Sequence, residues 1–213
     1  MNPTSAQAEQ IAVALLQIGA IALRPHQPFT WTSGIRSPIY CDNRLTMSYP
    51  EIRELIADGF AQLIRDKYPD ADVIAGTATA GIPHAAWVSQ KLNLPMIYIR
   101  DKAKGHGKEN LIEGSLRPGQ KVIVIEDLIS TGGSSLKSAL AVNEAGGRAL
   151  AVLAIFSYEL AKSEEAFGSA GVPLDTLSNY STLLKVAVER GAIAPEDLQL
   201  LRSWRENPTE FGK

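Results

Sequence analysis

The sequence predicts an α/β fold in which helices cover both faces of a doubly wound, mostly parallel sheet. Short apolar runs alternate with segments of helical periodicity from about residue 50 to residue 156, which is the pattern of repeated strand–helix units. The run Val122 to Ile125 is unbroken and β-branched, as expected of a strand buried on both faces of a parallel sheet. Turns of small residues follow two of these runs and lead directly into helix-like segments.

The N-terminal part of the chain contains two helix signals separated by a turn-rich stretch. Apolar residues spaced three and four apart within 11–18 mark one face of a first helix. Residues 20–44 are rich in β-forming and turn-forming types. Ser48, Pro50 and Glu51 then supply a cap, a first-turn proline and a capping-box acid, which predict that a second helix begins here.

From residue 73 onward, strand and helix signals alternate. A polar loop is expected over residues 100–119. We expect strands over 73–76, 96–99, 122–125 and 150–156, and helices over 81–92, 136–145, 160–168, 181–190 and 195–205. Right-handed crossovers would place the strand–helix turns at the carboxyl edge of the sheet, where ligands of open α/β sheets usually bind.

Composition restricts the class of protein. The 213 residues are 45% hydrophobic and 21% charged, which is typical of one globular domain, 1–213. A net charge of −2 argues against a general nucleic-acid-binding protein. Cys41 is the one cysteine, which excludes an intramolecular disulfide and a multi-cysteine metal site. No basic N-terminal segment and no apolar run of membrane-spanning length is present, so we expect a cytoplasmic protein without a membrane partner.

The stretch from Lys121 to Ser135 carries the strongest functional signal. Glu126 and Asp127 follow the apolar run directly, and a turn rich in hydroxyls and glycine comes next at 130–135. Such a turn directs backbone N–H groups at one spot beside a helix N-terminus, where a phosphate is held. The two carboxylates suit the hydroxyls of a sugar attached to that phosphate. The order of strand, acid pair and turn therefore predicts a ribose 5-phosphate site.

Glycine-rich turns also occur in ordinary connections and in two common nucleotide-binding motifs. An ordinary strand–turn–helix connection with solvated acids would share the turn but not the whole ordered combination. A P-loop is excluded because Ile82 and Pro83 stand where Lys and Ser or Thr are required. A dinucleotide fingerprint is excluded because Asn110 stands where the third glycine belongs.

A basic segment follows the predicted strand 96–99. Arg100, Lys102, Lys104 and His106 alternate along the chain, so an extended backbone would place them on one side, facing an anion. A solvated basic loop is the alternative. Glycines within the segment and its length favour a loop that closes over a ligand.

These motifs resemble those of the type I phosphoribosyltransferases. From about residue 29 to 207 the chain is similar to the orotate phosphoribosyltransferase family, in the form found in many Gram-positive bacteria. The segments that carry the resemblance read FTWTSGIRSPIYCDNR at 29–44, GTATAGIPHA at 76–85 and RDKAKGHGKEN at 100–110. The resemblance implies the fold of these enzymes, with a core over about 46–169 and a small hood built from about 1–45 and 170–213.

The resemblance also implies a reaction and its participants. Orotate would displace pyrophosphate from phosphoribosyl diphosphate (PRPP) and give orotidine 5′-phosphate in de novo pyrimidine (UMP) biosynthesis. Mg²⁺ would be held mainly by PRPP rather than directly by the protein. The chain would form a homodimer in which the loop Arg100 to Asn110 reaches the neighbouring site.

The resemblance assigns the site residue by residue. Catalytic roles fall to Lys104, Glu126 and Asp127. PRPP-binding positions are Thr77, Ala78, Thr79, Arg100, Lys104, His106, Glu126, Asp127, Leu128, Ile129, Ser130, Thr131, Gly132, Gly133 and Ser134. Orotate-binding positions are Phe29, Thr30, Ser33 and Ser130, with Arg36 as a weaker candidate.

The chain departs from the family at positions that matter for anionic groups. Thr32 and Ala80 stand where many relatives have Lys, and Asp101 replaces a second basic residue after Arg100. Residues 157–160 lack an arginine that assists orotate in some relatives. The orotate carboxylate must therefore be recognised differently here. A phosphoribosyltransferase for another base and a non-catalytic, PRPP-sensing regulator are the alternative functions.

Overall fold

The structure is a computed structural model that describes residues 5–31, 34–102 and 111–211. A six-stranded sheet with the strand order β10-β9-β8-β5-β6-β7 forms its centre. The strands are β5 (Val73–Thr77), β6 (Met96–Ile99), β7 (Ile112–Glu113), β8 (Lys121–Ile129), β9 (Arg148–Ser157) and β10 (Leu174–Asn179). All neighbouring pairs are parallel except β6 and β7, so the α/β sheet that the sequence predicts is confirmed.

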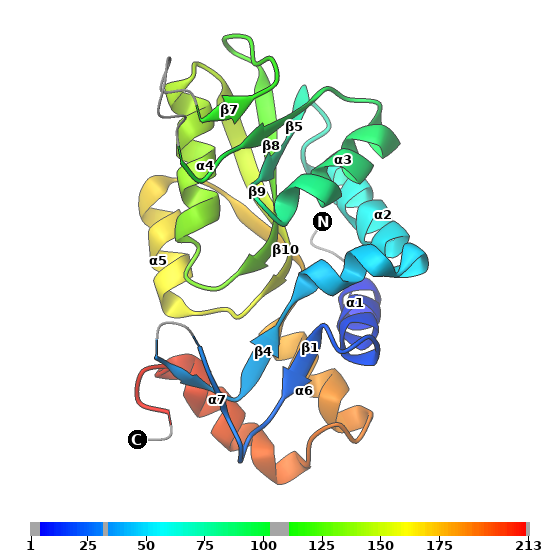
Figure 1. The fold of residues 1–213 in the computed structure, drawn as a ribbon, viewed down its shortest axis with the longest axis vertical. Coiled ribbons are helices and arrows are strands. Elements are labelled where there is room, and N and C mark those ends of the chain that lie inside the picture. The colour runs from blue at the N-terminus through cyan, green and yellow to red at the C-terminus, as the bar shows by residue number, and fades with distance from the viewer. Residues whose placement is uncertain (1–4, 32–33, 103–110, 212–213) are drawn as a thin grey trace.

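Helices cover both faces of this sheet (Figure 1). One face carries α1 (Ser5–Gln17), α2 (Pro50–Lys67) and α3 (Gly81–Leu92), and the other carries α4 (Gly133–Glu144) and α5 (Ala161–Ala170). Side chains of a strand alternate between the two faces, so Ile123 and Ile125 pack toward α1–α3 while Val122 and Val124 pack toward α4 and α5. This double burial accounts for the unbroken apolar run in β8.

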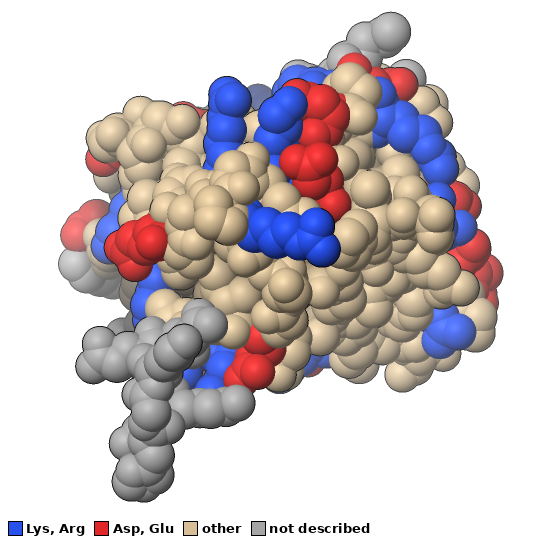
Figure 2. Space-filling model, turned by 90° about the horizontal axis from the view of Figure 1, so that it is seen from above, with Lys and Arg blue, Asp and Glu red and all other residues tan. Residues whose placement is uncertain are grey.

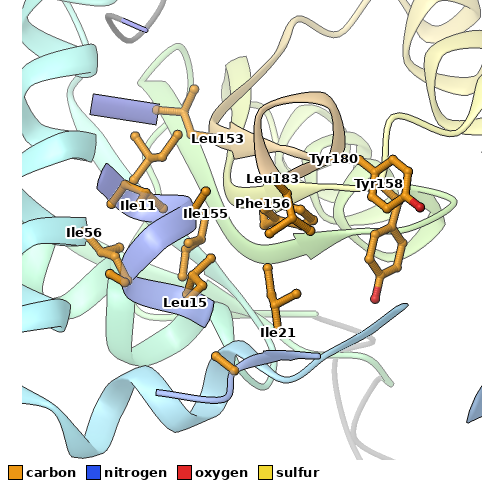
Figure 3. Packing of buried hydrophobic residues seen from close by; sticks show 14 of the residues in the cluster. Ile11, Leu15, Ile21, Ile56, Leu153, Ile155, Phe156, Tyr158, Tyr180 and Leu183 are labelled. Atoms are coloured by element: carbon orange, nitrogen blue, oxygen red, sulfur yellow. The ribbon is translucent and has the colours of Figure 1, made fainter. Parts of the chain in front are cut away.

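The larger of the two cores continues past the sheet. Ile11 and Leu15 of α1 pack with Ile56 of α2 and Ile155 of β9 (Figure 3). Tyr180 belongs to the same cluster. A single apolar cluster therefore joins the sheet to the segments beyond its carboxyl edge.

Segments from both ends of the chain gather at one end of the molecule (Figure 1). Their elements are β1 (Ile21–Leu23), β2 (Phe29–Thr30), β3 (Arg36–Ser37), β4 (Ile39–Cys41), the 3₁₀ helices η1 (Asn43–Ser48) and η2 (Pro195–Asp197), α6 (Tyr180–Glu189) and α7 (Leu198–Glu206). The strands pair antiparallel as β1–β4 and β2–β3. Trp31 contacts Trp204 edge to face, with ring centroids 5.9 Å apart. The ranges expected for the hood, about 1–45 and 170–213, contain most of these elements but also α1 and the sheet strand β10, and the boundary between hood and core stays a prediction.

Three local expectations were wrong. Ser48 is not the cap of α2, because Tyr49 occupies the N-cap position and makes no side-chain cap hydrogen bond. The helix after the glycine turn begins at Gly133 rather than at residue 136, so part of the turn is the first turn of α4. β8 extends through the acid pair to Ile129, because β9 continues to pair with it there.

Two strands went unpredicted because they are short or polar. β7 has two residues and lies inside the expected polar loop. β10 lies at the opposite edge of the sheet, and four of its six residues are polar, so it lacks the apolar run of β8. Among the described helices, none has both the length and the apolar character needed to cross a bilayer.

Acidic and basic side chains lie next to one another on one face of the molecule (Figure 2).

Candidate active site

A cleft of about 410 Å³ lies at the carboxyl edge of the sheet. Its lining comes from four places: the end of β4 with η1, the β5–α3 turn, the end of β8, and the start of α4. The lining residues are Cys41, Asp42, Arg44, Ala78, Thr79, Ala80, Glu126, Asp127, Leu128 and Ser134. The predicted acid pair and the β5–α3 turn thus share one cleft, as the ends of parallel strands should.

Glu126 is the more deeply buried member of the acid pair. Glu126 is buried, and its Oε1 accepts a hydrogen bond from the N–H of Asp127 at 3.0 Å. Burial, followed by the nearby Asp127 carboxylate, raises the pKa of Glu126 to about 9. Burial raises the pKa of Asp127 as well. Without a ligand, burial therefore disfavours the doubly ionised pair, and hydroxyls or positive charge in the cleft would favour its ionisation.

The turn after β8 combines one constrained glycine with one open glycine. Gly132 has φ +77° and is buried, and a Cβ there would lie 2.7 Å from Cε2 of Phe167. Gly133 has no atom within 4 Å of the place where its Cβ would be. Because the first N–H groups of α4 have no partners within the helix, the space beside Gly133 can take an anion.

The other predicted residues of this turn differ in their surroundings. Ser134 lines the cleft, and Thr131 is exposed. Ser130 is half-buried between the end of β8 and the turn. Ile129 is fully buried in the smaller core, and its carbonyl oxygen accepts from the N–H of Tyr158 at 3.0 Å. The side chain of Ile129 therefore does not face the cleft.

Two glycines allow the β5–α3 turn to pack closely against β8. A Cβ at Gly81 would clash with the carbonyl oxygen of Ile125, and one at Gly76 would lie 2.8 Å from Cα of Ile82. This close approach brings Ala78 and Thr79 to the acid pair. Thr77 is buried, and its Oγ1 has no hydrogen-bond partner among the described residues.

Arg100 does not line the main cleft but lines a smaller pocket. Thr77 and Ser134 line the same pocket. Nη1 of Arg100 is 3.4 Å from Oε1 of Glu113. The backbone N–H of Arg100 donates a hydrogen bond to the carbonyl oxygen of Leu111. Lys104 and His106, the other predicted PRPP-binding residues of this segment, lie outside the described residues.

Two of the residues predicted to bind orotate, Phe29 and Thr30, form β2 and are not part of the cleft lining, whereas Ser130 follows the end of β8. The ring of Phe29 lies 4.7 Å from the guanidinium carbon of Arg24 and 5.6 Å from the ring of Tyr40. Thr30 is exposed, and Ser33 lies outside the described residues. The orotate contacts stay predictions.

Comparison with known proteins agrees with this site. The chain is 60% identical over 202 residues to the orotate phosphoribosyltransferase of Bacillus caldolyticus. The aligned region covers 95% of this chain and 98% of that protein. The chain belongs to the orotate phosphoribosyltransferase family. It is 59% identical to the orotate phosphoribosyltransferase of Halalkalibacterium halodurans over 94% of this chain and 96% of that one.

Broader comparisons agree with this assignment. The family described as phosphoribosyl transferase domain matches residues 48–166. The crystal structure of orotate phosphoribosyltransferase from Aeropyrum pernix has a TM-score of 0.74 at 27% identity, covering 86% of this chain and 99% of that one. Both the expected family and the expected fold are confirmed.

Sequence reasoning missed the segment Cys41 to Arg44 as part of the cleft. Arg44 is exposed there, and its Nε and Nη2 contact Oδ1 and Oδ2 of Asp42 at 2.6 and 2.8 Å. This pairing lowers the pKa of Asp42. Asn43 is fully buried and donates from Nδ2 to the carbonyl oxygen of Asp127 at 2.7 Å. The one available signal was the position of Arg44 in a segment that resembles the family.

The donors in the cleft suit a metal ion only in part. Glu126 and Asp127 are adjacent carboxylates on the cleft wall, and Asp42 is paired with Arg44. Across residues 5–31, 34–102 and 111–211, no group of three or more His, Cys, Asp and Glu side chains could hold a metal ion. This donor set fits an ion whose other ligands come from a substrate.

Proposed function

We propose that the cleft transfers the 5-phosphoribosyl group of PRPP to a ring nitrogen of orotate, giving orotidine 5′-phosphate and pyrophosphate. One observation supports this proposal most strongly. The acid pair, the glycine turn with its open Gly133 and the β5–α3 turn surround one cleft, in a chain that belongs to this family. The bond from C1 to a pyrophosphate oxygen breaks, the bond from C1 to nitrogen forms, and the ring nitrogen loses its proton.

The acid pair acts on the sugar. Asp127 and Glu126 accept hydrogen bonds from the ribose hydroxyls, and their negative charge stabilises the positive character that C1 gains as pyrophosphate leaves. No enzyme nucleophile is needed, so catalysis consists of positioning and charge stabilisation. Because burial raises the pKa of both carboxyl groups, hydroxyls and positive charge brought by the substrate would favour the ionised pair.

The phosphates of PRPP bind on two sides of the acid pair. The turn Ser130 to Ser134 takes the 5′-phosphate in the open space beside Gly133. The end of β5 and the β5–α3 turn, with Thr77, Ala78 and Thr79, take the pyrophosphate, and Arg44, which lines the same cleft, meets its charge. Lys104 and His106 complete this site, as the family resemblance implies.

Mg²⁺ accompanies PRPP in this proposal. Oxygens of PRPP would supply most of its ligands, and no side chain of the protein is assigned as a direct ligand. When bound, the ion would neutralise negative charge on the departing pyrophosphate. The carboxyl groups of Glu126 and Asp127 would orient the ribose hydroxyls relative to the ion.

The biological setting follows from the reaction. Orotidine 5′-phosphate is the nucleotide that de novo pyrimidine biosynthesis converts to UMP, so we place the enzyme in the cytoplasm. Its substrates are small anions, which requires no nucleic-acid or membrane surface. We also propose a homodimer, because the family resemblance assigns the loop Arg100 to Asn110 to the neighbouring site.

A base panel tests the proposed function. Purified protein with PRPP and Mg²⁺ is offered orotate, uracil, adenine or hypoxanthine, and pyrophosphate release is measured with nucleotide product. We expect turnover with orotate and little with the other bases. Preference for another base would identify a different phosphoribosyltransferase. Binding of PRPP without turnover of any base would identify a PRPP-sensing regulator.

A further inference from the structure

The backbone of Asp127 lies where β8 loses one of its neighbours. The pairing of β5 with β8 ends at Gly76 and Ile125, and the chain then leaves the sheet in the β5–α3 turn. β8 runs on to Ile129 with β9 as its neighbour. Backbone groups in this last part of β8 therefore need hydrogen-bond partners from outside the sheet.

Side chains supply these partners to Asp127. Its carbonyl oxygen accepts a hydrogen bond from Nδ2 of Asn43 at 2.7 Å, and its N–H donates to Oε1 of Glu126 at 3.0 Å. Asn43 is fully buried, so water does not compete for its amide. The two residues are 84 positions apart, so this bond fixes the N-terminal segment to the centre of the site.

Asn43 is itself held in one orientation. Its Oδ1 accepts a hydrogen bond from Sγ of Cys41 at 3.3 Å, which directs the amide NH₂ group toward Asp127. The carbonyl oxygen of Asn43 accepts from Oγ1 of Thr46 at 2.6 Å, within the same 3₁₀ helix. Both the side chain and the backbone of Asn43 are therefore held by hydrogen bonds, which fixes the position of the amide group that donates to Asp127.

We propose that Asn43 is a positioning residue for Asp127. Its amide takes the place of the missing β5 neighbour and sets the direction in which the Asp127 carboxylate meets the ribose. This inference rests on the proposed function, in which that carboxylate acts on the sugar. Displacing a catalytic group by roughly 1 Å can cost on the order of 100-fold in rate. A buried residue that never touches substrate would thus control the reaction.

The first test compares two variants that each disturb the N-terminal segment. Asn43→Ser keeps a small polar side chain but is too short to reach the Asp127 carbonyl, so we expect kcat/KM for PRPP to fall by about 10- to 100-fold. Ser37→Ala is the control. It removes a buried hydrogen bond to the carbonyl oxygen of Ile39, 2.8 Å away, without touching β8, and should leave kcat/KM near the wild-type value.

The decisive test repeats Asn43→Ser in an Asp127→Asn background. If Asn43 acts through the Asp127 carboxylate, the second change should cost far less there than in the wild type, because the group that it positions is already lost. An equal cost in both backgrounds, or unchanged kinetics in folded Asn43→Ser, would overturn the proposal.

A second variant keeps the proposal testable if Asn43→Ser does not fold. Asn43→Leu keeps a branched side chain of similar size but has no hydrogen-bond donor, and it enters the same comparison. Wild-type protein that fails to convert PRPP and orotate would instead count against the proposed function. The two failures are therefore distinct.

Discussion

Glu126 and Asp127 both line the cleft, yet they play different parts in the fold. Glu126 accepts a hydrogen bond from the backbone of Asp127 and is 7% exposed, whereas Asp127 is half-buried beside the open cleft. Glu126 therefore supports the backbone as well as the ligand. Its raised pKa means that an ionised carboxyl group at this position destabilises the folded protein.

This burial predicts a pH-dependent loss of stability. A carboxyl group with a raised native pKa binds its proton more tightly in the folded chain, so stability falls as pH rises from its ordinary value of 4.5 toward about 9. Glu126→Gln keeps the acceptor but cannot ionise. We expect its Tm without ligand to match that of the wild type near pH 5 and to exceed it increasingly toward pH 9.

Thermal unfolding at several pH values, without PRPP, checks this prediction. Glu144→Gln, at an exposed position at the end of α4, is the control and should follow the wild-type curve. A difference between Glu126→Gln and wild type that stays constant with pH would contradict the assignment of the raised pKa to Glu126.

At the scale of elements, the turn between β8 and α4 contains two glycines with different roles. Gly132 is needed for the fold, and Gly133 leaves space for a ligand. From the sequence alone, a bulky residue at Gly132 would block the phosphate and leave the fold intact. The structure corrects that expectation, because Gly132 has a left-handed backbone and packs against Phe167 of α5. A substitution there disturbs the α4–α5 packing. Gly133 is the position where added bulk meets open space.

Gly133→Val therefore tests the phosphate site. Its side chain would occupy the space assigned to the 5′-phosphate, so we expect affinity for PRPP to fall by about 10-fold or more while the fold is retained. Gly168→Val is a matched control, because Gly168 lies in α5 and also has no atom within 4 Å of its Cβ position. Calorimetric titration with PRPP makes the comparison. Equal binding by the two variants would place the phosphate elsewhere.

The sequence predicted those elements whose burial leaves a continuous pattern. β8 was predicted because both of its faces are covered, and the acid pair was placed at the cleft because parallel strands end at one edge. β10 was missed because an edge strand needs no apolar run. The bond from Asn43 to Asp127 was missed because it joins residues 84 positions apart, and no local pattern records such a contact.

At the scale of the whole molecule, the cleft is short of positive charge. Among the described residues that line it, Arg44 is the one basic side chain, and it is paired with Asp42. Three carboxyl groups line the same cleft. PRPP carries several negative charges, so further cations must come from elsewhere. The segment with Lys104 and His106 lies outside the described residues, and the family resemblance assigns it to the site of a second subunit.

Subunit mixing tests that assignment. Lys104→Ala and Asp127→Asn should each lower kcat by about 10-fold or more, because each removes charge that acts in the transition state. If the loop serves the neighbouring subunit, a hybrid dimer contains one site with both residues intact. At random equal mixing about half of the dimers are hybrids, which gives roughly a quarter of wild-type activity. Recovery is measured after subunit exchange has been demonstrated with differently tagged chains. No recovery in exchanged dimers would mean that the loop acts within its own subunit or that Lys104 has no such role.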